Sequence, residues 1–300
     1  MKRVLIIQIR QLGDILLSTP LCRALRENLS SVEVHFLTSE IGKSIVLGNP
    51  YIDEILTLSE GIVGEVRAVL TTLRNRYDAV IDVQRTGRSR RITLFSLSSR
   101  RIAFKKKNFE IGYNVPIEWE NRGYTAWERI KLLEGLGVKV RNYQDYLPEF
   151  YNFKPVKSLK LDKYAVIVPT ARKREKMWEV KNFQEIISFI HRELGIKTVL
   201  LYGKGEEEEK KKYKNLQGTI IPERALSIGE SASVIKGALF FIGLNSFASH
   251  LSISVGTKTI IIDKKHSGWF PPIPLVKEVY GDGKFPNVDS VKKAILELMG

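Results

Sequence analysis

Hydrophobic and polar positions along the chain follow two alternating patterns. Short apolar runs bounded by turn residues predict buried strands, and apolar residues three or four positions apart predict helices. In the first half, this predicts strands at 3–9, 33–37, 54–58 and 79–83, and helices near 15–28, 41–47, 63–75 and 125–136. Such alternation is typical of an α/β fold with a parallel, doubly wound sheet.

Residues 142–162 interrupt this rhythm with Pro148, Pro155 and mixed aromatic residues, which indicates a linker. The second half then repeats the same order of elements. Its predicted strands are 164–168, 197–202, 239–242 and 259–262, and its predicted helices are 182–194, 206–216, 231–236, 247–254 and 288–299. We therefore predict two α/β domains, at residues 1–155 and 156–300. Ligands are expected in a cleft between them, beyond the carboxyl ends of the strands.

The length of 300 residues suits two domains, and the single cysteine restricts the cellular setting. One Cys22 excludes a disulfide framework and a cysteine-rich zinc site, and it fits a reducing compartment. The opening apolar run is interrupted by Gln8 and is too short for a signal peptide. Nothing approaches the roughly 20 apolar residues of a membrane helix, so we expect a cytoplasmic protein.

The formal net charge of +15 is concentrated in part in one basic tract. Residues 85–107 contain no acidic residue and nine basic ones: Arg85, Arg88, Arg90, Arg91, Arg100, Arg101, Lys105, Lys106 and Lys107. The tract is either a solvated basic face or a surface for a polyanion such as nucleic acid, anionic lipid or a phosphorylated glycolipid. It contains no helix-turn-helix, zinc or RNA-recognition motif, which argues against nucleic acid.

The first candidate site is the turn after the first predicted strand, Arg10-Gln11-Leu12-Gly13-Asp14. Gly13 permits a tight turn or the close approach of a ligand, and Asp14 lies near the start of a helix. Asp14 is either a helix N-cap or a carboxylate that accepts a proton from an attacking hydroxyl. The local sequence by itself favours capping.

The second candidate follows the first predicted strand of the second half, in the segment 169–178. Arg172, Lys173, Arg174 and Lys176 place four cations within five positions, just before Trp178. Arginine and lysine side chains neutralise phosphate oxygens, so this segment is either a phosphate-binding loop or a basic surface loop next to a core tryptophan.

The third candidate lies at another strand-to-helix junction, between Gly243 and His250. Asn245 or Ser246 is positioned to cap the helix that begins near Phe247, and the amides of a helix start attract anions. His250 either contacts a ligand or packs against the sheet, and packing is the favoured interpretation for the residue taken alone.

Together, these segments resemble glycosyltransferase family 9, the lipopolysaccharide heptosyltransferases. The segment 10–21 looks like the amino-terminal signature of the family, and 77–84 followed by Arg88 is similar to its central strand and basic helix. Lys176-Met177-Trp178 matches a Lys-x-Trp element, and 245–251 lies where the family has Asp-Thr-Gly-x-x-His-Leu. The matches occur in the same order across most of the chain.

The resemblance implies a GT-B fold of two Rossmann-like domains, with the acceptor on the first and the nucleotide-sugar on the second. It implies inverting transfer of heptose from ADP-heptose to a lipopolysaccharide core, with no metal and no cofactor, and with Asp14 as the general base. The final helix, 288–299, is expected to pack back on the first domain.

By the same resemblance, the expected partners are a nucleotide-sugar and an anionic glycolipid, with peripheral contact with the cytoplasmic face of the inner membrane and no nucleic acid. The implied donor-binding residues are Thr170, Arg174, Lys176, Asn245, Ser246, Phe247 and His250. The implied acceptor-binding residues are Arg10, Gly13, Arg85 and Arg88.

The third segment departs from the family pattern, with Asn245 in place of Asp and Phe247 in place of Gly. A phenylalanine fills space where backbone normally approaches phosphate, and it does not readily adopt a left-handed conformation. The segment after Ile262 also lacks the Gly-Pro-Thr-Asp loop of the family, although Lys264, Lys265 and Ser267 offer alternative phosphate ligands. These departures support an alternative function, in which a degenerate member binds nucleotide or anionic glycolipid without catalysis.

Overall fold

The chain forms two compact units, Met1–Asn152 and Phe153–Gly300. The computed structural model describes residues 1–300 except 107–110, 157–158 and 160–161. The division lies within a few residues of the boundary predicted between 155 and 156.

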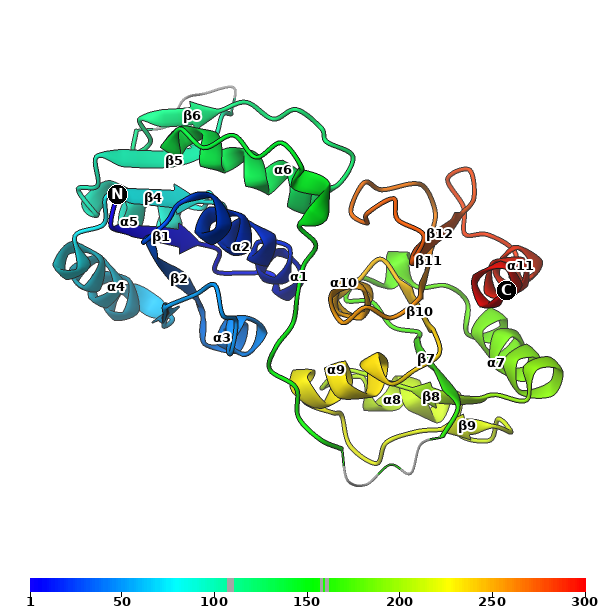
Figure 1. Cartoon of the computed structure of the whole chain (residues 1–300). Coiled ribbons are helices and arrows are strands. Elements are labelled where there is room, and N and C mark those ends of the chain that lie inside the picture. The colour runs from blue at the N-terminus through cyan, green and yellow to red at the C-terminus, as the bar shows by residue number, and fades with distance from the viewer. Residues whose placement is uncertain (107–110, 157–158, 160–161) are drawn as a thin grey trace. The chain divides into compact units, whose positions relative to one another are not determined.

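The first unit contains a six-stranded parallel sheet in the order β3-β2-β1-β4-β5-β6 (Figure 1). Its strands are β1 Arg3–Ile7, β2 Glu33–Ser39, β3 Glu54–Leu58, β4 Ala79–Asp82, β5 Arg100–Phe104 and β6 Val115–Ile117. Its helices are α1 Leu12–Leu16, α2 Thr19–Asn28, α3 Glu40–Val46, α4 Gly61–Asn75, α5 Gly87–Phe95 and α6 Thr125–Ile130, with short 3-10 turns at Lys131–Leu136 and Tyr143–Asp145.

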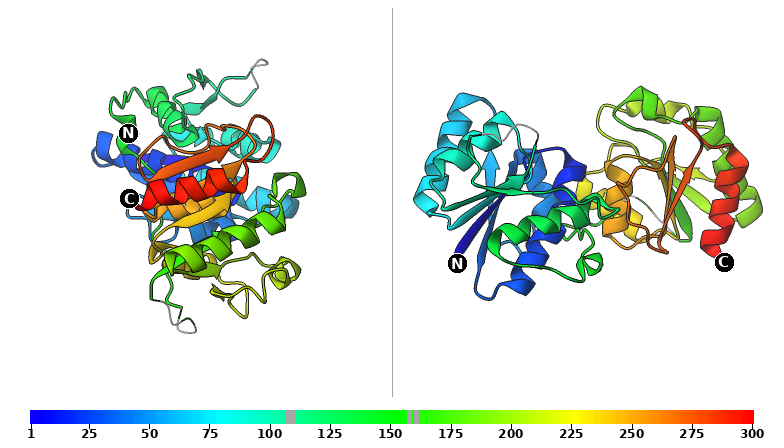
Figure 2. Two further views of the ribbon diagram at one scale, coloured as in Figure 1. Left: turned by 90° about the vertical axis from the view of Figure 1, so that its right-hand side faces the viewer. Right: turned by 90° about the horizontal axis from the view of Figure 1, so that it is seen from above.

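The central strand β1 is buried on both faces because helices cover the sheet from both sides. Helices α4 and α5 lie on one face, while α2, α3 and α6 lie on the other (Figures 1 and 2). The apolar residues of β1 pair in register with both neighbours, Ile6 with Phe36 of β2 and with Ile81 of β4. The continuous apolar runs seen in the sequence therefore correspond to strands that have no solvent-facing side.

The second unit repeats this plan with the parallel order β12-β11-β10-β7-β8-β9. Its strands are β7 Tyr164–Val168, β8 Lys197–Leu200, β9 Thr219–Ile220, β10 Phe241–Leu244, β11 Thr259–Asp263 and β12 Val276–Tyr280. Its helices are α7 Val180–Leu194, α8 Glu207–Lys211, α9 Ile228–Lys236, α10 Phe247–Ser254 and α11 Val288–Met299, with a 3-10 turn at Arg174–Lys176.

When the strands are numbered within each unit, both sheets have the order 3-2-1-4-5-6 of a dinucleotide-binding Rossmann sheet. The strand order reverses between β1 and β4 in the first unit and between β7 and β10 in the second. Loops that leave neighbouring strands in opposite directions diverge at this reversal, and ligands bind in the crevice that results. The predicted two-domain, doubly wound α/β architecture is confirmed.

The final helix α11 packs inside the second unit. Its apolar face, Val291, Ala294, Ile295 and Leu298, is buried in one core with Phe183 and Ile187 of α7. The apolar stripe of α11 is thus used within the second unit, and the expectation from the resemblance, that this helix also packs back on the first domain, stays a prediction. Burial of that stripe requires the nearest complementary apolar surface, which α7 provides.

The helix predicted at 15–28 is divided into α1 and α2. Pro20 lies in the first turn of α2, where its missing N–H does no harm. Inside a continuous helix, Pro20 would remove a hydrogen bond and its ring would clash with the carbonyl of Leu16. The predicted helix 206–216 is also shorter than expected, since only Glu207–Lys211 is helical.

Candidate active site

The side chain of Gln84, just beyond the end of β4, holds the start of the loop after β1 in place. The side-chain oxygen of Gln84 accepts hydrogen bonds from the backbone N–H groups of Ile9 (3.0 Å) and Arg10 (2.8 Å) and from the amide of Gln8 (2.9 Å). Because β1 and β4 are the neighbours at which the strand order reverses, Gln84 fixes the loop at the position where ligands enter such sheets.

Asp14 occupies the third position of the short helix α1, and Gln11 is the N-cap. One carboxylate oxygen, Oδ2, lies 3.4 Å from the backbone nitrogen of Gln11, which is a long hydrogen bond. Asp14 therefore contributes to a capping box, so the capping interpretation is correct in part. However, its side chain remains 29% exposed.

The other carboxylate oxygen of Asp14 is bound by Arg129 of α6. Nη2 of Arg129 donates to Oδ1 of Asp14 at 2.6 Å, while Nη1 donates to the backbone oxygen of Asp14 and, at 2.9 Å, to Oγ of Ser18. The Arg129 side chain is only 8% exposed. Burial lowers the pKa of Arg129 and the Asp14 carboxylate opposes this effect. An arginine stays charged under such conditions, so Asp14 lies against a fixed buried cation.

Nothing in the sequence pattern distinguished Arg129 from the other arginines of the chain. It lies 115 residues from Asp14, on a helix that was predicted but assigned no function. The consequence for Asp14 is an asymmetric carboxylate. Oδ1 is occupied by a strong charge-assisted hydrogen bond, whereas Oδ2, among the residues that the structure describes, has only the long contact with Gln11.

Two of the predicted acceptor residues, Arg10 and Gly13, lie on the same loop as Asp14. Arg10 is exposed, and Gly13 is the second residue of α1, directly before Asp14. Arg10 is therefore an accessible cation four residues from the carboxylate.

Arg85 and Arg88 follow β4, and both bind other parts of the first unit. Arg85 has a left-handed φ of 50°, and its guanidinium lies 5.2 Å from the ring centre of Tyr113. Its backbone N–H donates to the buried carboxylate of Asp82 at 2.9 Å. Nη2 of Arg88 donates to the carbonyl of Ser59 at 2.8 Å. These two residues therefore stabilise the loops at the carboxyl edge of the sheet, and their contact with an acceptor stays a prediction.

Asp82 is a buried carboxylate at the end of β4. The hydroxyl of Tyr113 donates to it at 2.6 Å. Burial raises the pKa of Asp82, and the hydrogen bonds from Tyr113 and from the Arg85 amide oppose that effect. With no exposed surface, the carboxylate anchors the chain as it leaves β4.

In the second unit, the predicted phosphate-binding loop follows β7. Thr170 is buried, and its hydroxyl donates to Glu206 at 2.7 Å, while the Gly203 amide donates to the same oxygen. Arg174 and Lys176 lie exposed on the 3-10 turn. These two cations are open to solvent, whereas Thr170 is used to join two loops.

Trp178 is a core residue, as one of the two interpretations of this segment proposed. It is buried against Phe183, with ring centres 5.1 Å apart, and its indole N–H donates to the carbonyl of Pro286 at 3.2 Å. The tryptophan therefore anchors the carboxyl end of the basic loop.

The third segment follows β10 and begins α10. Ser246 is the N-cap, although its hydroxyl makes no capping bond. The amide of Asn245 instead donates to Asp263 at 2.8 Å, so Asn245 ties β10 to the end of β11. Phe247 is the first helical residue and has no positive φ, so the substitution of Phe for Gly costs no backbone strain.

His250 packs against an aromatic ring, as favoured for this residue alone. Its imidazole is buried and stacks on Phe270, with ring centres 4.8 Å apart and an angle of 21° between the planes. Loops 169–178 and 245–250 leave neighbouring strands, because Val168 of β7 pairs with Gly243 of β10. The fold thus brings the two predicted donor segments together at the carboxyl edge of the second sheet.

The loop after β11 is partly committed to internal contacts. The ammonium of Lys264 lies 5.2 Å from the ring centre of Phe285, and Oγ of Ser267 lies 3.5 Å from Glu278. Burial raises the pKa of Glu278, and the nearby His266 opposes this. Lys265 is exposed.

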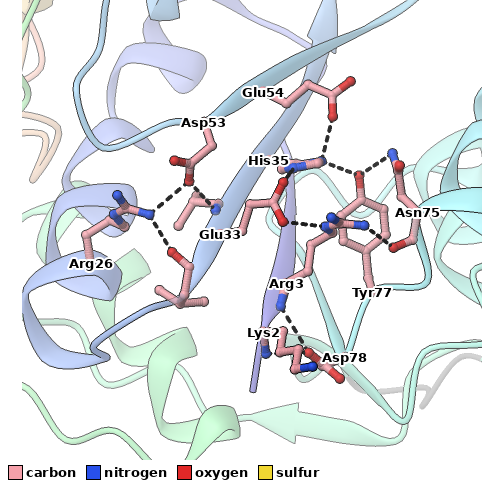
Figure 3. Close-up of polar contacts among 12 residues, drawn as sticks. Lys2, Arg3, Arg26, Glu33, His35, Asp53, Glu54, Asn75, Tyr77 and Asp78 are labelled. Carbon is pink, nitrogen blue, oxygen red and sulfur yellow. Dashed lines mark hydrogen bonds and ion pairs between the residues drawn. The ribbon is translucent and has the colours of Figure 1, made fainter.

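A second titratable cluster lies at the amino-terminal ends of the strands of the first unit (Figure 3). His35 is buried, with Nδ1 2.8 Å from the Tyr77 hydroxyl and Nε2 2.8 Å from Glu33. Arg3 donates to the same glutamate at 2.7 Å. Asp14 follows the carboxyl end of β1, so this cluster occupies the opposite edge of the sheet. It provides hydrogen-bond partners for both ring nitrogens of the buried His35.

Between residues 1 and 300, outside the three short gaps, no helix is long and apolar enough to span a membrane. In the same ranges, no three His, Cys, Asp or Glu residues are grouped as metal ligands.

Comparison with known proteins gives a consistent result. The family model for glycosyltransferase family 9 (heptosyltransferase) matches residues 66–275. Lipopolysaccharide heptosyltransferase 3 of Escherichia coli is 25% identical over 293 residues, covering 86% of this chain and 83% of the relative. The fold is similar to that of the E. coli heptosyltransferase WaaC with ADP, with a TM-score of 0.81, 17% identity and 99% of each chain covered.

A further solved structure, the E. coli ADP-heptose lipopolysaccharide heptosyltransferase II, has a TM-score of 0.80 at 15% identity, over 100% of this chain and 98% of that one. These likenesses confirm the GT-B fold predicted from the resemblance. With the family model matching most of its length, this chain is a glycosyltransferase and belongs to glycosyltransferase family 9, the heptosyltransferase family.

Proposed function

We propose that this enzyme transfers heptose from ADP-heptose to a hydroxyl of a lipopolysaccharide-core acceptor, with inversion at the anomeric carbon, without a metal ion, and with Asp14 as the general base. The observation that carries the proposal is the asymmetric carboxylate of Asp14. Arg129 occupies Oδ1 at 2.6 Å, and Oδ2 remains available in a partly exposed side chain at the carboxyl end of β1.

The chemistry requires one proton acceptor and one stabilised leaving group. Oδ2 of Asp14 takes the proton of the acceptor hydroxyl while the hydroxyl oxygen of the acceptor bonds to C1 of the sugar. The bond between C1 and the diphosphate oxygen breaks, and ADP leaves with the electron pair. Attack from the face opposite the leaving group inverts the configuration. Arg129 is a positioning residue, because it holds the carboxylate in one orientation and contacts no substrate in this scheme.

The charge that develops on the diphosphate is assigned to groups of the second unit. Arg174 and Lys176 are exposed cations on the loop after β7, and the amides that begin α10 at Phe247 point along a helix axis that favours anions. Cations and helix-terminal amides stabilise such a leaving group without a metal. Three contacts support the two loops: that of Thr170 with Glu206, that of Asn245 with Asp263 and the stack of His250 on Phe270.

The acceptor is assigned to the first unit. Arg10 is exposed on the same loop as Asp14, and the basic tract beginning at Arg85 and Arg88 suits an acceptor that carries phosphate or carboxylate groups. A glycolipid of this kind would be met at the cytoplasmic face of the inner membrane.

The proposal is tested with Asp14→Asn in a transfer assay with ADP-heptose and a heptose-free lipopolysaccharide core. Asparagine keeps the shape and an oxygen for Arg129 but takes no proton. We expect kcat to fall by about two to four orders of magnitude, while ADP binding measured by calorimetry stays within about twofold. Turnover equal to that of the wild type would remove Asp14 from the role of base.

Asp53→Asn is the matched control. Asp53 also pairs with an arginine, Arg26 at 2.9 Å, but lies at the amino-terminal edge of the same sheet (Figure 3). This substitution should leave kcat unchanged. If both variants lose activity equally, the effect arises from general damage to the unit and not from loss of a base.

The alternative of a degenerate, non-catalytic member rested on Asn245 and Phe247. Phe247 lies in an unstrained helical turn, which weakens the steric argument. The same assay separates the two functions, because a degenerate member would bind ADP or the glycolipid and show no transfer by the wild-type chain.

A further inference from the structure

The outer face of α4 exposes an unusual number of aliphatic side chains. Ile62 is 82% exposed, Val63 74%, Val66 51% and Leu70 48%. The buried face of the helix, which includes Gly64, Ala68 and Thr72, packs inward. Exposed apolar residues that cluster on one surface mark a site of interaction with another molecule or with a membrane.

The spacing of these residues makes one continuous stripe. Ile62, Val66 and Leu70 are four residues apart, so they lie above one another on the helix, and Val63 adjoins them. Helix α5 runs beside α4 in the same direction, since Arg88 contacts Gly61 and Arg91 pairs with Glu65. Phe95 is four residues beyond Arg91, on the same side of α5, and is 50% exposed.

The charge around this stripe is strongly basic. Residues 59–97 contain seven arginines, no lysine and four acidic residues. Of the acids, Asp82 is buried, Glu65 is paired with Arg88 and Arg91, and Asp78 accepts backbone hydrogen bonds at the amino-terminal edge of the sheet. The fourth, Glu60, is exposed at the N-cap of α4. Arg67 and Arg74 are exposed on α4 itself. Aliphatic side chains flanked by arginine, in a segment where seven arginines outnumber four acidic residues, complement a surface that is both anionic and apolar.

The stripe also lies at the correct end of the sheet. Helix α4 follows β3, so Ile62 and Val63 in its first turn lie at the carboxyl edge, the edge at which the Asp14 loop leaves β1. An enzyme docked through this turn would present that edge toward the lipid surface.

We propose that the α4 stripe, Ile62, Val63, Val66 and Leu70 with the flanking Arg67 and Arg74, docks the first unit on an anionic phospholipid membrane. The choice of a membrane as the occupant rests on the proposed glycolipid acceptor, whose acyl chains keep it in a bilayer. The aliphatic residues enter the interface while the arginines contact lipid phosphates.

Co-sedimentation of the full chain with vesicles tests the proposal. The vesicles contain phosphatidylethanolamine either with or without phosphatidylglycerol. We expect the wild type to bind the anionic vesicles and to be released as salt is raised. The triple variant Ile62→Ser, Val66→Ser, Leu70→Ser should bind at least about tenfold more weakly, and Arg67→Gln with Arg74→Gln should remove the preference for phosphatidylglycerol.

The matched control replaces exposed aliphatic residues on the other face of the sheet, Ile41→Ser with Leu47→Ser, and should bind like the wild type. All these side chains are exposed, so circular dichroism should show unchanged folding. Transfer to a water-soluble, deacylated acceptor should be the same for the wild type and the triple variant.

The outcomes separate docking from catalysis. If the wild type does not bind anionic vesicles, or if the triple variant binds as well as the control, the docking surface is wrong even when transfer to the soluble acceptor proceeds. If the wild type forms a dimer that only the triple variant dissociates, and vesicle binding is absent, the stripe is a contact between copies of the chain. Absence of transfer to the soluble acceptor, with vesicle binding intact, contradicts the proposed function and not the docking surface.

Discussion

The guanidinium of Arg129 lies 2.6 Å from the carboxylate of Asp14, across 115 residues of sequence. The pair joins the first turn after β1 to α6, and Arg129 also binds the backbone oxygen of Asp14 and the hydroxyl of Ser18. One buried side chain therefore fixes both the main chain and the side chain of the proposed base. Orientation of a reacting group in this way is worth a large part of an enzymatic rate.

Substitution of Arg129 should reduce kcat and leave donor binding nearly unchanged. Arg129→Lys keeps the charge but loses the planar fork, so we expect about a tenfold loss. Arg129→Leu should lose about a hundredfold or more. Steady-state kinetics with saturating acceptor provides kcat, and calorimetry with ADP provides the binding constant.

A purely structural role for Arg129 would show a different pattern. Both variants would then lower the free energy of unfolding, and kcat per folded molecule would be unchanged in each. The lysine variant would therefore show no advantage in kcat over the leucine variant. Urea denaturation of each variant alongside the kinetics distinguishes the two cases.

Lys176→Ala should weaken the binding of ADP. Lys176 is exposed on the turn after β7, and loss of one cation from a diphosphate site raises Kd by about tenfold. Lys181→Ala is the control, because Lys181 is an exposed lysine nearby that pairs with Glu179 at 2.8 Å. Equal Kd values for Lys176→Ala and wild type would exclude Lys176 from the donor site.

Protonation of Glu230 should lower the free energy of unfolding of the second unit at acidic pH. The Arg224 side chain, followed by the amide and hydroxyl of Ser227, lowers the pKa of Glu230 to about 2, from an ordinary value of 4.5. In the unfolded chain the carboxylate takes up a proton near 4.5. The stabilisation is therefore complete above that pH and is lost as the pH falls from about 4.5 towards 2.

The test is Glu230→Gln. This variant breaks a capping box at the start of α9, so we expect a loss of about 1 kcal/mol at neutral pH. The difference from wild type should shrink as the pH falls through that window in urea denaturation series. The exposed Glu223→Gln should follow the wild type throughout, and a difference for Glu230→Gln that stayed constant with pH would contradict the assignment.

Tyr77→Phe should lower stability without lowering activity. The hydroxyl lies 2.8 Å from Nδ1 of His35 and 3.0 Å from the amide of Asn75, at the edge of the sheet opposite Asp14 (Figure 3). Loss of these buried hydrogen bonds should cost about 1–2 kcal/mol in the free energy of unfolding. Tyr280→Phe, at a half-exposed position, is the control and should cost much less free energy of unfolding. A fall in kcat for Tyr77→Phe would contradict the prediction, because it would mean that this edge of the sheet affects the site at the opposite edge.

Much of the fold could be predicted because its strands are buried on both faces. The segment 164–168 was predicted as a strand and is β7, and 247–254 was predicted as a helix and is α10. The strand β5 was missed, because Arg100 and Arg101 at its start hide a short apolar core. The edge strand β12 was missed for a similar reason, since Lys277 and Glu278 interrupt its apolar pattern.

The candidate site, too, could be predicted only in part. Asp14, Lys176 and the segment 245–250 were predicted as site residues because each follows a strand, and the carboxyl ends of parallel strands share one edge. The partners of these residues were not found. Neither the contact of Thr170 with Glu206 nor the stack of His250 on Phe270 has a signal in local sequence.

The sequence by itself determined the alternating α/β architecture, its division into two halves and the loops that carry the candidate chemistry. These features depend on local periodicity and on turn residues, which report whether a side chain faces a sheet or solvent. Only the tertiary structure decided that Arg129 holds Asp14, that α11 packs on α7, and that α4 leaves an aliphatic stripe exposed. Such contacts depend on which surfaces meet after the chain has folded, and residues more than a hundred positions apart leave no trace of that meeting in a single sequence.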